Sequence, residues 1–292
     1  LRARDYAQAV TYSFIPESHA TFIEPDLLPL PLSNPISSEM AVMRPSIWPG
    51  LLASIQHNQN RQVGRVRLFE HGQVFRCAAE GAAIEQVQRL SGAVSGRAQP
   101  DQWSTDGRLV DFFDVKADVE ALLHALGHSD IRMVAAVHPA LHPGQSAQIL
   151  SSGEVCGWLG KLHPELKSRF DLRADCFVFD LSLDALLAEQ AFEYRQASRF
   201  PAVRRDLAVV VAEQVSLFEV EQSIRAAAGE YLRDLQLFDV YRGQGIDSDS
   251  KSLALGLIFQ ASSSTLTDEV VDAAVAAVVA ALNQDVGGVL RD

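Results

Sequence analysis

Four histidines stand in two pairs whose spacing is compatible with zinc binding on a helix. Residues four positions apart lie on one face of a helix, and histidine is a common zinc ligand. The pairs are His124 with His128 and His138 with His142. Pro139 and Pro143 interrupt the second pair, and the first spans Gly127, where a helix is expected to end. Neither pair has a third ligand nearby, so we expect structural or solvent-facing roles.

Asp111 and Asp114 flank two phenylalanines and could form a paired acid and base. A strand end that leads into a helix at Val115 is the simpler interpretation. The sequence has neither a G-x-S-x-G elbow nor a G-x-x-x-x-G-K-[ST] loop, so serine hydrolases and P-loop proteins lose their main support. Its three cysteines are scattered without a C-x-x-C pair, which fits a reducing cytosol and argues against a disulfide framework or thiolate metal site.

With 292 residues, the chain is long enough for two domains of ordinary size. Hydrophobic residues make up 48%, yet no apolar run reaches the length of a membrane span, so we expect a soluble, cytoplasmic protein with no membrane partner. Residues 1–4 are followed by no apolar signal segment, and we expect the chain to begin inside a longer polypeptide. The formal net charge is −12. Nucleic-acid binders normally carry a basic footprint, which this chain lacks.

The last third has the pattern of a small βαββαβ module. Strands are expected at 206–211, 232–241 and 252–260, because apolar and β-branched residues dominate there. A helix over 216–228 opens with a serine cap, and a second follows the cap Thr267, with its apolar face over 270–282. This order is the split βαβ of the ferredoxin-like fold, with both helices on one face of an antiparallel sheet.

Side-chain alternation along 252–260 predicts which face of that sheet the helices cover. Bulky residues occur at every second position and should lie under the helices. These are Leu253, Leu255, Leu257 and Phe259. The positions between them are mostly small, so the other face should be open enough for a docked base or backbone. The alternative is that a neighbouring domain covers this face.

The first domain, expected over 1–192, has an α+β pattern with many antiparallel strands. The predicted strands are 9–14, 65–75, 87–94, 131–137, 146–150, 155–160 and 177–181, and the predicted helices are 48–61, 115–126 and 164–170. No βαβ alternation suggests a parallel nucleotide-binding sheet. A linker near 192–198 should separate this domain from the module at 198–292.

Several long sequence motifs, in a fixed order, resemble those of one protein family. In the last third they are SRFPAVRRDLAVVV (198–211), FDVYRG (238–243), KSLAL (251–255), TLTDE (265–269) and LRD (290–292). Together they resemble the ferredoxin-like, anticodon-binding domain that closes the beta subunit of bacterial phenylalanyl-tRNA synthetase. The resemblance implies that this module grips a tRNA anticodon. Because residues 196–292 hold eight basic and fourteen acidic residues, we expect it to bind RNA weakly when alone.

The first domain resembles the catalytic-like, class II synthetase domain of the same subunit. The matching words are LSNP (32–35), MRPSIWPGLL (43–52), NQNR (58–61), VRLFEHGQVF (66–75), DFFDVK (111–116), LHPGQSA (141–147) and GWLGKLHP (157–164). The resemblance thus covers nearly the whole chain. It implies an alpha2 beta2 heterotetramer with the alpha subunit, and tRNA(Phe) as the RNA partner.

We expect this class II domain to be non-catalytic. A working site holds ATP with an arginine of the second motif and with a G-x-G-x-[DE]-R strand. Arg67 and Glu70 lie in the second-motif region, but the glycine-rich word is missing, and the nearest approach, residues 243–248, lies in the other domain. The resemblance implies that adenylation occurs in the alpha subunit. The whole synthetase would use ATP and magnesium, with no cofactor bound by this chain.

The resemblance also indicates which residues would touch RNA. Tyr241, at the end of the second strand, resembles the anticodon-facing edge of the family, and its ring could stack on an unpaired base with Arg242 near a phosphate. Ala208 and Ala254 are small enough to leave the base room. The weaker companions are Lys251 and Ser252. The alternative is a strand-end tyrosine with its ring on the core and its hydroxyl in water.

Class II cores pair through the segment before the second motif, so we expect residues 32–61 to pack against synthetase cores. This stretch supplies Pro35, Pro45, Trp48 and an apolar helix. An exposed apolar patch should therefore appear there. The competing hypothesis for the whole chain is a self-contained enzyme that uses the carboxylates and histidines of the first domain. The missing glycine-rich motif favours a non-catalytic part of a tRNA ligase.

Overall fold

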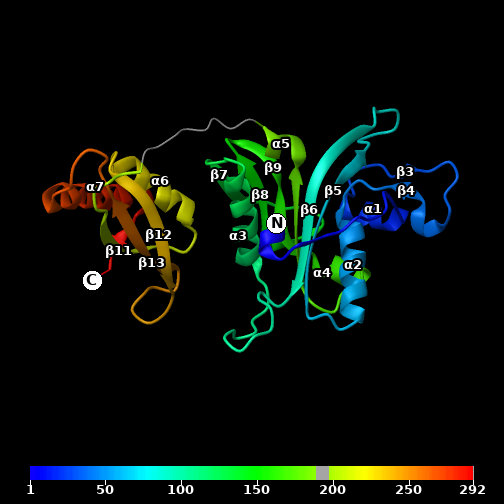
Figure 1. Cartoon of the computed structure of the whole chain (residues 1–292), viewed down its shortest axis with the longest axis horizontal. Helices are drawn as coiled ribbons and strands as arrows, with labels where there is room; N and C mark the ends of the chain where they lie inside the picture. Colours follow the sequence, from blue (N-terminus) through cyan, green and yellow to red (C-terminus); the bar gives the residue numbers. More distant parts are fainter. Residues whose placement is uncertain (189–196, 292) are drawn as a thin grey trace. The chain divides into compact units, whose positions relative to one another are not determined.

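The chain folds into two compact units, Leu1–Phe192 (unit 1) and Glu193–Asp292 (unit 2) (Figure 1). A computed structural model describes residues 1–188 and 197–291. Most of the linker predicted at 192–198 lies outside the described residues. Each unit has its own apolar core.

Unit 1 is built on a seven-stranded sheet with the order β1-β5-β6-β10-β9-β8-β7. Its neighbouring strands are antiparallel, except that β1 runs parallel to β5. The strands are β1 (Ala7–Gln8), β5 (Arg65–Arg76), β6 (Glu85–Gly96), β7 (Ile131–Ala135), β8 (Leu141–Ser151), β9 (Glu154–Leu162) and β10 (Cys176–Ser182). A small second sheet has the order β2-β4-β3, from β2 (Phe14–Ile15), β3 (Leu30–Pro31) and β4 (Val42–Met43).

Helices cover both faces of the large sheet, as Figure 1 shows for α2 and α3. One apolar cluster lies beneath α1 (Glu17–Ile23), α2 (Trp48–Asn60) and α4 (Pro164–Arg169), and the other beneath α3 (Phe112–Ala125) and α5 (Leu183–Leu187). Two 3₁₀ helices, η1 (Arg2–Arg4) and η2 (Ser38–Met40), complete the unit. The α+β class and its antiparallel sheet are as predicted.

The strand predicted over 9–14 is wrong. Only Ala7–Gln8 and Phe14–Ile15 are strands, in different sheets. Between them the chain is held by a side chain, because both the backbone N–H and the hydroxyl of Thr11 donate to Glu70. Glu70 is itself buried and paired with Arg44 at 2.7 Å. The Thr11 segment is therefore held by side-chain hydrogen bonds and not by pairing with a neighbouring strand.

The helix predicted at 115–126 begins earlier, at Phe112. Asp111 is its N-cap and forms a capping box with Asp114, so both carboxylates bind backbone N–H groups. Arg108 also donates to Asp114, and this ion pair together with the backbone hydrogen bond lowers the pKa of Asp114. The paired carboxylates therefore hold the start of a helix, as the simpler interpretation expected, but over residues 97–110, which the structure describes, no strand leads into it and Leu109 forms only an isolated bridge with Arg97.

Unit 2 has the predicted βαββαβ order. Its elements are β11 (Val203–Ala212), α6 (Leu217–Ala227), β12 (Leu232–Tyr241), β13 (Ser250–Phe259), α7 (Asp268–Val286) and β14 (Val289–Leu290). The sheet order is β12-β13-β11-β14. Ser216 caps α6 in a capping box with Glu219, whereas Thr267 stands at the N-cap of α7 without a side-chain cap bond.

The core of unit 2 lies between its sheet and its two helices, as the alternation predicts. The bulky residues of β13 are at most 2% exposed and share a cluster with Val220 and Ile224 of α6 and Val278 of α7. In the neighbouring β11, Arg205 leaves on the helix side, since it pairs with Asp268 and Asp272 of α7. The side chains of alternate residues therefore point to the face without helices.

Unit 1 buries a histidine between two tryptophan rings. The imidazole centroid of His138 lies 5.3 Å from that of Trp48 and 4.9 Å from that of Trp158. The backbone N–H of Ala140 donates to His138 Nδ1 at 3.1 Å, which suits the neutral ring. Burial lowers the pKa of His138 from 6.5 to about 4. Charging this histidine therefore opposes the folded state.

We expect His138 to make unit 1 less stable in mild acid. Between pH 6.5 and 4 the unfolded chain binds a proton that the folded chain excludes, so the free energy of unfolding falls as the pH falls through 6.5 and levels off below 4. The loss between pH 7 and pH 5 should be about 2 kcal/mol. Urea unfolding followed by tryptophan fluorescence measures this loss, because Trp48, Trp103 and Trp158 all lie in unit 1.

His138→Gln should remove this part of the pH dependence, and the exposed control His71→Gln should retain it. The same slope in His138→Gln and wild type would contradict the assignment.

Candidate functional site

The side of the unit 2 sheet away from α6 and α7, here called the open face, has small residues at its centre. Ala208 of β11 and Ala254 of β13 are directly opposite each other, and both are partly exposed. Gly256 follows two positions along β13. The open face is therefore flat in the middle, as the alternation predicts.

Tyr241 ends β12 on the open face, opposite Ser252 of β13. Its ring is half-buried and does not belong to the apolar core. The Tyr241 hydroxyl donates to the carbonyl of Gln244 at 3.2 Å, which ties the ring to the loop after β12. The guanidinium carbon of Arg291 lies 4.7 Å from the ring centroid. The ring is thus presented for stacking, with a cation already on one side.

Arg242 and Lys251 lie together at the end of the sheet rather than on the open face. Arg242 makes an ion pair with Glu213 at 2.7 Å, and Lys251 donates to the backbone carbonyl of Glu213. The Arg242 ion pair lowers the pKa of Glu213. Ser252 is only 3% exposed, so it forms part of the floor beside Tyr241. The structure thus brings Tyr241, Ala208 and Ala254 to one face and places the two cations elsewhere.

Two arginines and an aromatic ring of the open face are also absent from the residues predicted to bind RNA. They are Arg204, Phe238 and Arg291. Arg291 follows β14, whose pairing with β11 brings the chain end to Ala208, and the N–H of Arg291 donates to the Ala208 carbonyl. The word LRD at 290–292 could have drawn attention to Arg291, because a basic residue there follows a strand-like pair.

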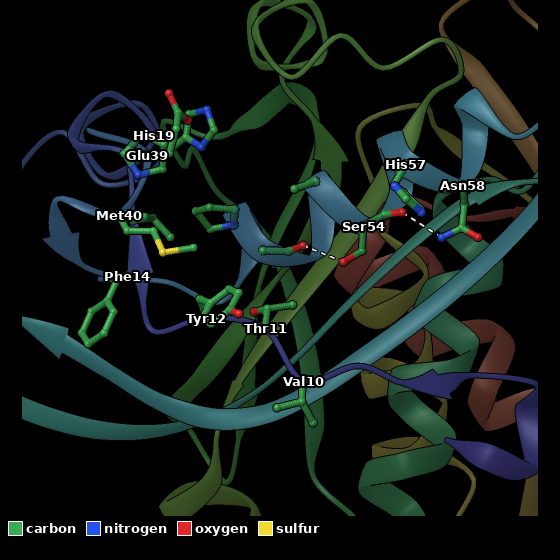
Figure 2. A pocket seen from close by; sticks show the side chains of 15 residues that line it. Val10, Thr11, Tyr12, Phe14, His19, Glu39, Met40, Ser54, His57 and Asn58 are labelled. Carbon is green, nitrogen blue, oxygen red and sulfur yellow. Dashed lines mark hydrogen bonds between the residues drawn. The ribbon is translucent and has the colours of Figure 1, made fainter. Parts of the chain in front are cut away.

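Unit 1 contains an open groove of about 560 Å³ (Figure 2). One wall is the segment around Val10 and Tyr12, which leads from β1 to β2, and another is the outer side of α2. Val10 is 89% exposed and Tyr12 71% exposed. Polar groups are fewer and include His57 and Asn58 of α2. An exposed apolar groove with a polar rim is typical of a protein-docking surface.

The interface predicted over 32–61 is only partly supported. Pro45, Trp48 and the apolar side of α2 are buried in unit 1, so these residues are wrong as an interface. They are covered because one face of the large sheet needs them as its core. Residues 33–39 are exposed, and Ile36 is 88% exposed. Only Pro35 and Ile36 of this stretch are apolar, and Glu39 is its one residue that lines the groove.

Arg67 and Glu70, in the second-motif region, are both held in buried ion pairs. Arg67 pairs with Asp118, which also accepts a hydrogen bond from the Tyr6 hydroxyl at 2.9 Å. Glu70 pairs with Arg44. These charges stabilise contacts between segments far apart in the chain, and breaking such a pair would leave an uncompensated buried charge.

No cluster of three or more histidine, cysteine, aspartate or glutamate residues could hold a metal ion in the described part of the chain. His128 contacts the Ser151 hydroxyl at 2.7 Å and the Leu186 carbonyl at 3.2 Å. His142 accepts the N–H of Gly144, two residues on. Among the described helices none is long and apolar enough to cross a membrane.

Two family profiles match successive parts of the chain. Residues 1–183 match the family described as "Phenylalanyl tRNA synthetase beta chain CLM domain", and residues 198–291 match the "Ferredoxin-fold anticodon binding domain". The two matches fall within units 1 and 2, respectively.

Two proteins similar in sequence to this chain have the same name. The phenylalanine–tRNA ligase beta subunit of Nitrosococcus oceani is 44% identical over 99% of this chain, and that of Pseudomonas syringae pv. tomato is 46% identical over 100%. The chain spans 36% and 37% of the lengths of these relatives. Among solved structures, a pyrrolysyl tRNA synthetase from Desulfitobacterium hafniense aligns with a TM-score of 0.48 at 16% identity, over 64% of this chain and 61% of that one, a likeness too distant to carry an inference.

Proposed function

The chain belongs to the family of phenylalanine–tRNA ligase beta subunits, and we propose that it works as part of such a subunit. In this proposal the open face of unit 2 binds the anticodon of tRNA(Phe), and unit 1 holds the alpha subunit in an alpha2 beta2 heterotetramer. The complete ligase attaches phenylalanine to its tRNA in the cytoplasm, using ATP and magnesium.

The observation that carries the RNA-binding role is the position of Tyr241. Its ring stands on a sheet face without helices, next to a floor of small residues at Ala208 and Ala254. Aromatic rings on open sheets stack on unpaired bases, and such stacking tolerates different bases. Arg291 over the ring supplies a cation that can move to a phosphate or share the stack.

The net charge of unit 2 indicates that RNA binding depends on contacts at the open face. Residues 196–292 have eight basic residues against fourteen acidic ones, so the long-range field of this part of the chain repels RNA. Arg242 is neutralised by Glu213. Affinity would therefore come from ring stacking and from arginines on the open face, and the rest of the ligase would supply the remaining attraction.

Unit 1 is proposed as a non-catalytic scaffold, with ATP and magnesium bound outside this chain. The groups that a self-contained enzyme would need already have structural partners. Asp111 and Asp114 cap a helix, and His138 is buried between tryptophans. Arg67 and Glu70 are engaged in ion pairs. The alternative of an independent enzyme is therefore not favoured.

We propose that the alpha subunit docks on the groove of unit 1 beside α2. The groove combines exposed apolar walls at Val10 and Tyr12 with a few hydrogen-bonding groups, such as Asn58. Burying those walls would remove apolar surface from water without breaking the core of the unit. The surrounding region also includes the exposed Ile36.

Replacing Tyr241 by leucine in the complete ligase should weaken tRNA recognition. Leucine keeps an apolar side chain and loses the ring, and stacking is worth about 1 to 3 kcal/mol per base. The Michaelis constant for tRNA should therefore rise about tenfold or more. Phenylalanine activation, measured by ATP–pyrophosphate exchange without tRNA, should stay unchanged.

Tyr241→Phe is the matched control, because it keeps the ring and loses only the hydroxyl bond to Gln244. It should stay within a few-fold of wild type. Equal loss of aminoacylation and activation in Tyr241→Leu would indicate misfolding, and no loss of either would remove Tyr241 from the RNA site.

Ala53→Arg should weaken assembly with the alpha subunit. Ala53 is exposed on α2 and lines the groove, so an arginine there would fill the groove and place a charge on its apolar wall. Sedimentation of the complete beta subunit mixed with the alpha subunit should show an apparent dissociation constant raised at least about tenfold. The control Ser168→Arg, on the exposed side of α4, should assemble normally. Normal assembly of Ala53→Arg would place the docking surface elsewhere.

A further inference from the structure

An irregularity in β12 turns a second aromatic ring toward the open face. Tyr241 faces this side, so strict alternation would put Phe238 on the helix side. However, the register between β12 and β13 shifts between Leu237 and Asp239, which face Leu255 and Ala254. The extra residue is Phe238, and a bulge of this kind re-aims a side chain. Its ring is 50% exposed and is not part of the core.

Arg204 reaches this ring across the sheet. It lies on β11, two strands from Phe238, and its guanidinium carbon is 5.3 Å from the ring centroid. The side chain passes over Gly256 of the strand between them. A β-carbon at Gly256 would come within 2.9 to 3.0 Å of the guanidinium, so Arg204 would have to shift if a larger residue stood there. Asp206 accepts from Arg204 Nε at 2.7 Å and fixes its orientation.

The pair of Phe238 and Arg204 has the same construction as the pair of Tyr241 and Arg291. In each case a ring on β12 meets a guanidinium that comes from the β11 side of the sheet. The residues between β12 and that side are small, namely Ala254 and Gly256 on β13. The two rings are three positions apart on one strand. The open face thus carries two ring and guanidinium stacks on a flat floor.

We propose that Phe238 and Arg204 form a second platform for a single-stranded RNA nucleotide, next to the one that would stack on Tyr241. This rests on the proposed anticodon-binding role of the open face. The base stacks on the exposed side of the Phe238 ring. Arg204 donates its Nε–H to Asp206, and its Nη groups donate to the adjoining phosphate. Stacking on two neighbouring rings offsets the acidic charge of this part of the chain.

The simplest competing role for the pair is structural. An exposed cation over a ring stabilises a fold slightly and would do so without RNA. That role predicts a change in thermal stability on removing either partner and no change in RNA affinity beyond it. The two roles are therefore separated by measuring both quantities in the same variants.

The test measures binding of a fluorescently labelled anticodon stem-loop of tRNA(Phe) to the complete ligase at low salt, because this part of the chain alone is expected to bind RNA weakly. Phe238→Leu removes the ring, and Arg204→Lys keeps the charge but loses the planar fork. Each should raise the dissociation constant about tenfold. The double variant should be little worse than either single one, because both residues build one platform.

Matched controls lie on α6, at the opposite side of the sheet. They are Phe218→Leu and Arg225→Lys, and both should bind RNA within about twofold of wild type. Thermal unfolding followed by circular dichroism checks that each variant is folded. Arg204 is exposed, so Arg204→Lys carries the test if Phe238→Leu proves unstable.

The outcomes separate the second platform from the function on which it rests. If Tyr241→Leu loses affinity while Phe238→Leu and Arg204→Lys bind as wild type, the second platform is refuted and the anticodon-binding role stands. If wild type does not bind the stem-loop, or if none of the three variants changes affinity, the anticodon-binding role fails and the platform fails with it. Loss in both platform variants, with normal binding by the α6 controls, supports the platform.

Discussion

The two-residue period of β13 is the constraint on which the proposed RNA site depends. Because alternate side chains leave opposite sides of a strand, one short sequence builds both the core and the open face. Leu255 and Leu257 lie under the helices, whereas Ala254 and Gly256 form the floor on the other side. A bulky residue at either small position would compete for the space that the long side chains on this face occupy. The stability of unit 2 and the access to its rings are thus set by the same strand.

The fold of unit 2 could be predicted from sequence, and part of its open face could not. Period, caps and β-branched runs indicate every element from β11 to α7, and Tyr241 is recognisable at the end of a strand. Phe238 escapes such analysis because a bulge adds one residue to β12. The side chains before the bulge therefore point to the opposite faces from those that simple alternation predicts. Arg204 and Arg291 escape because each reaches a β12 ring across the intervening strand or strands, a contact between segments far apart in the sequence.

Unit 1 shows a different limit of sequence patterns. Its long strands and the helices α2, α3 and α4 follow from periodicity, but the segment over 9–14 does not form the predicted strand, because Glu70 binds Thr11 in place of a neighbouring strand. An apolar helix side looks the same whether it will meet a sheet of its own unit or another protein. The large sheet buries Trp48 and the apolar side of α2, and the groove lies on the other side of that helix.

Photo-cross-linking of the complete ligase to tRNA(Phe) with 4-thiouridine in the anticodon loop tests the central claim most directly. A base stacked on the open face places its reactive atom beside the rings of β12, so mass spectrometry of the cross-linked peptides should identify Tyr241 or Phe238. Residues of α6 and α7 should not be found. Cross-links confined to those helices, or to unit 1, would contradict the assignment of the open face as the anticodon site.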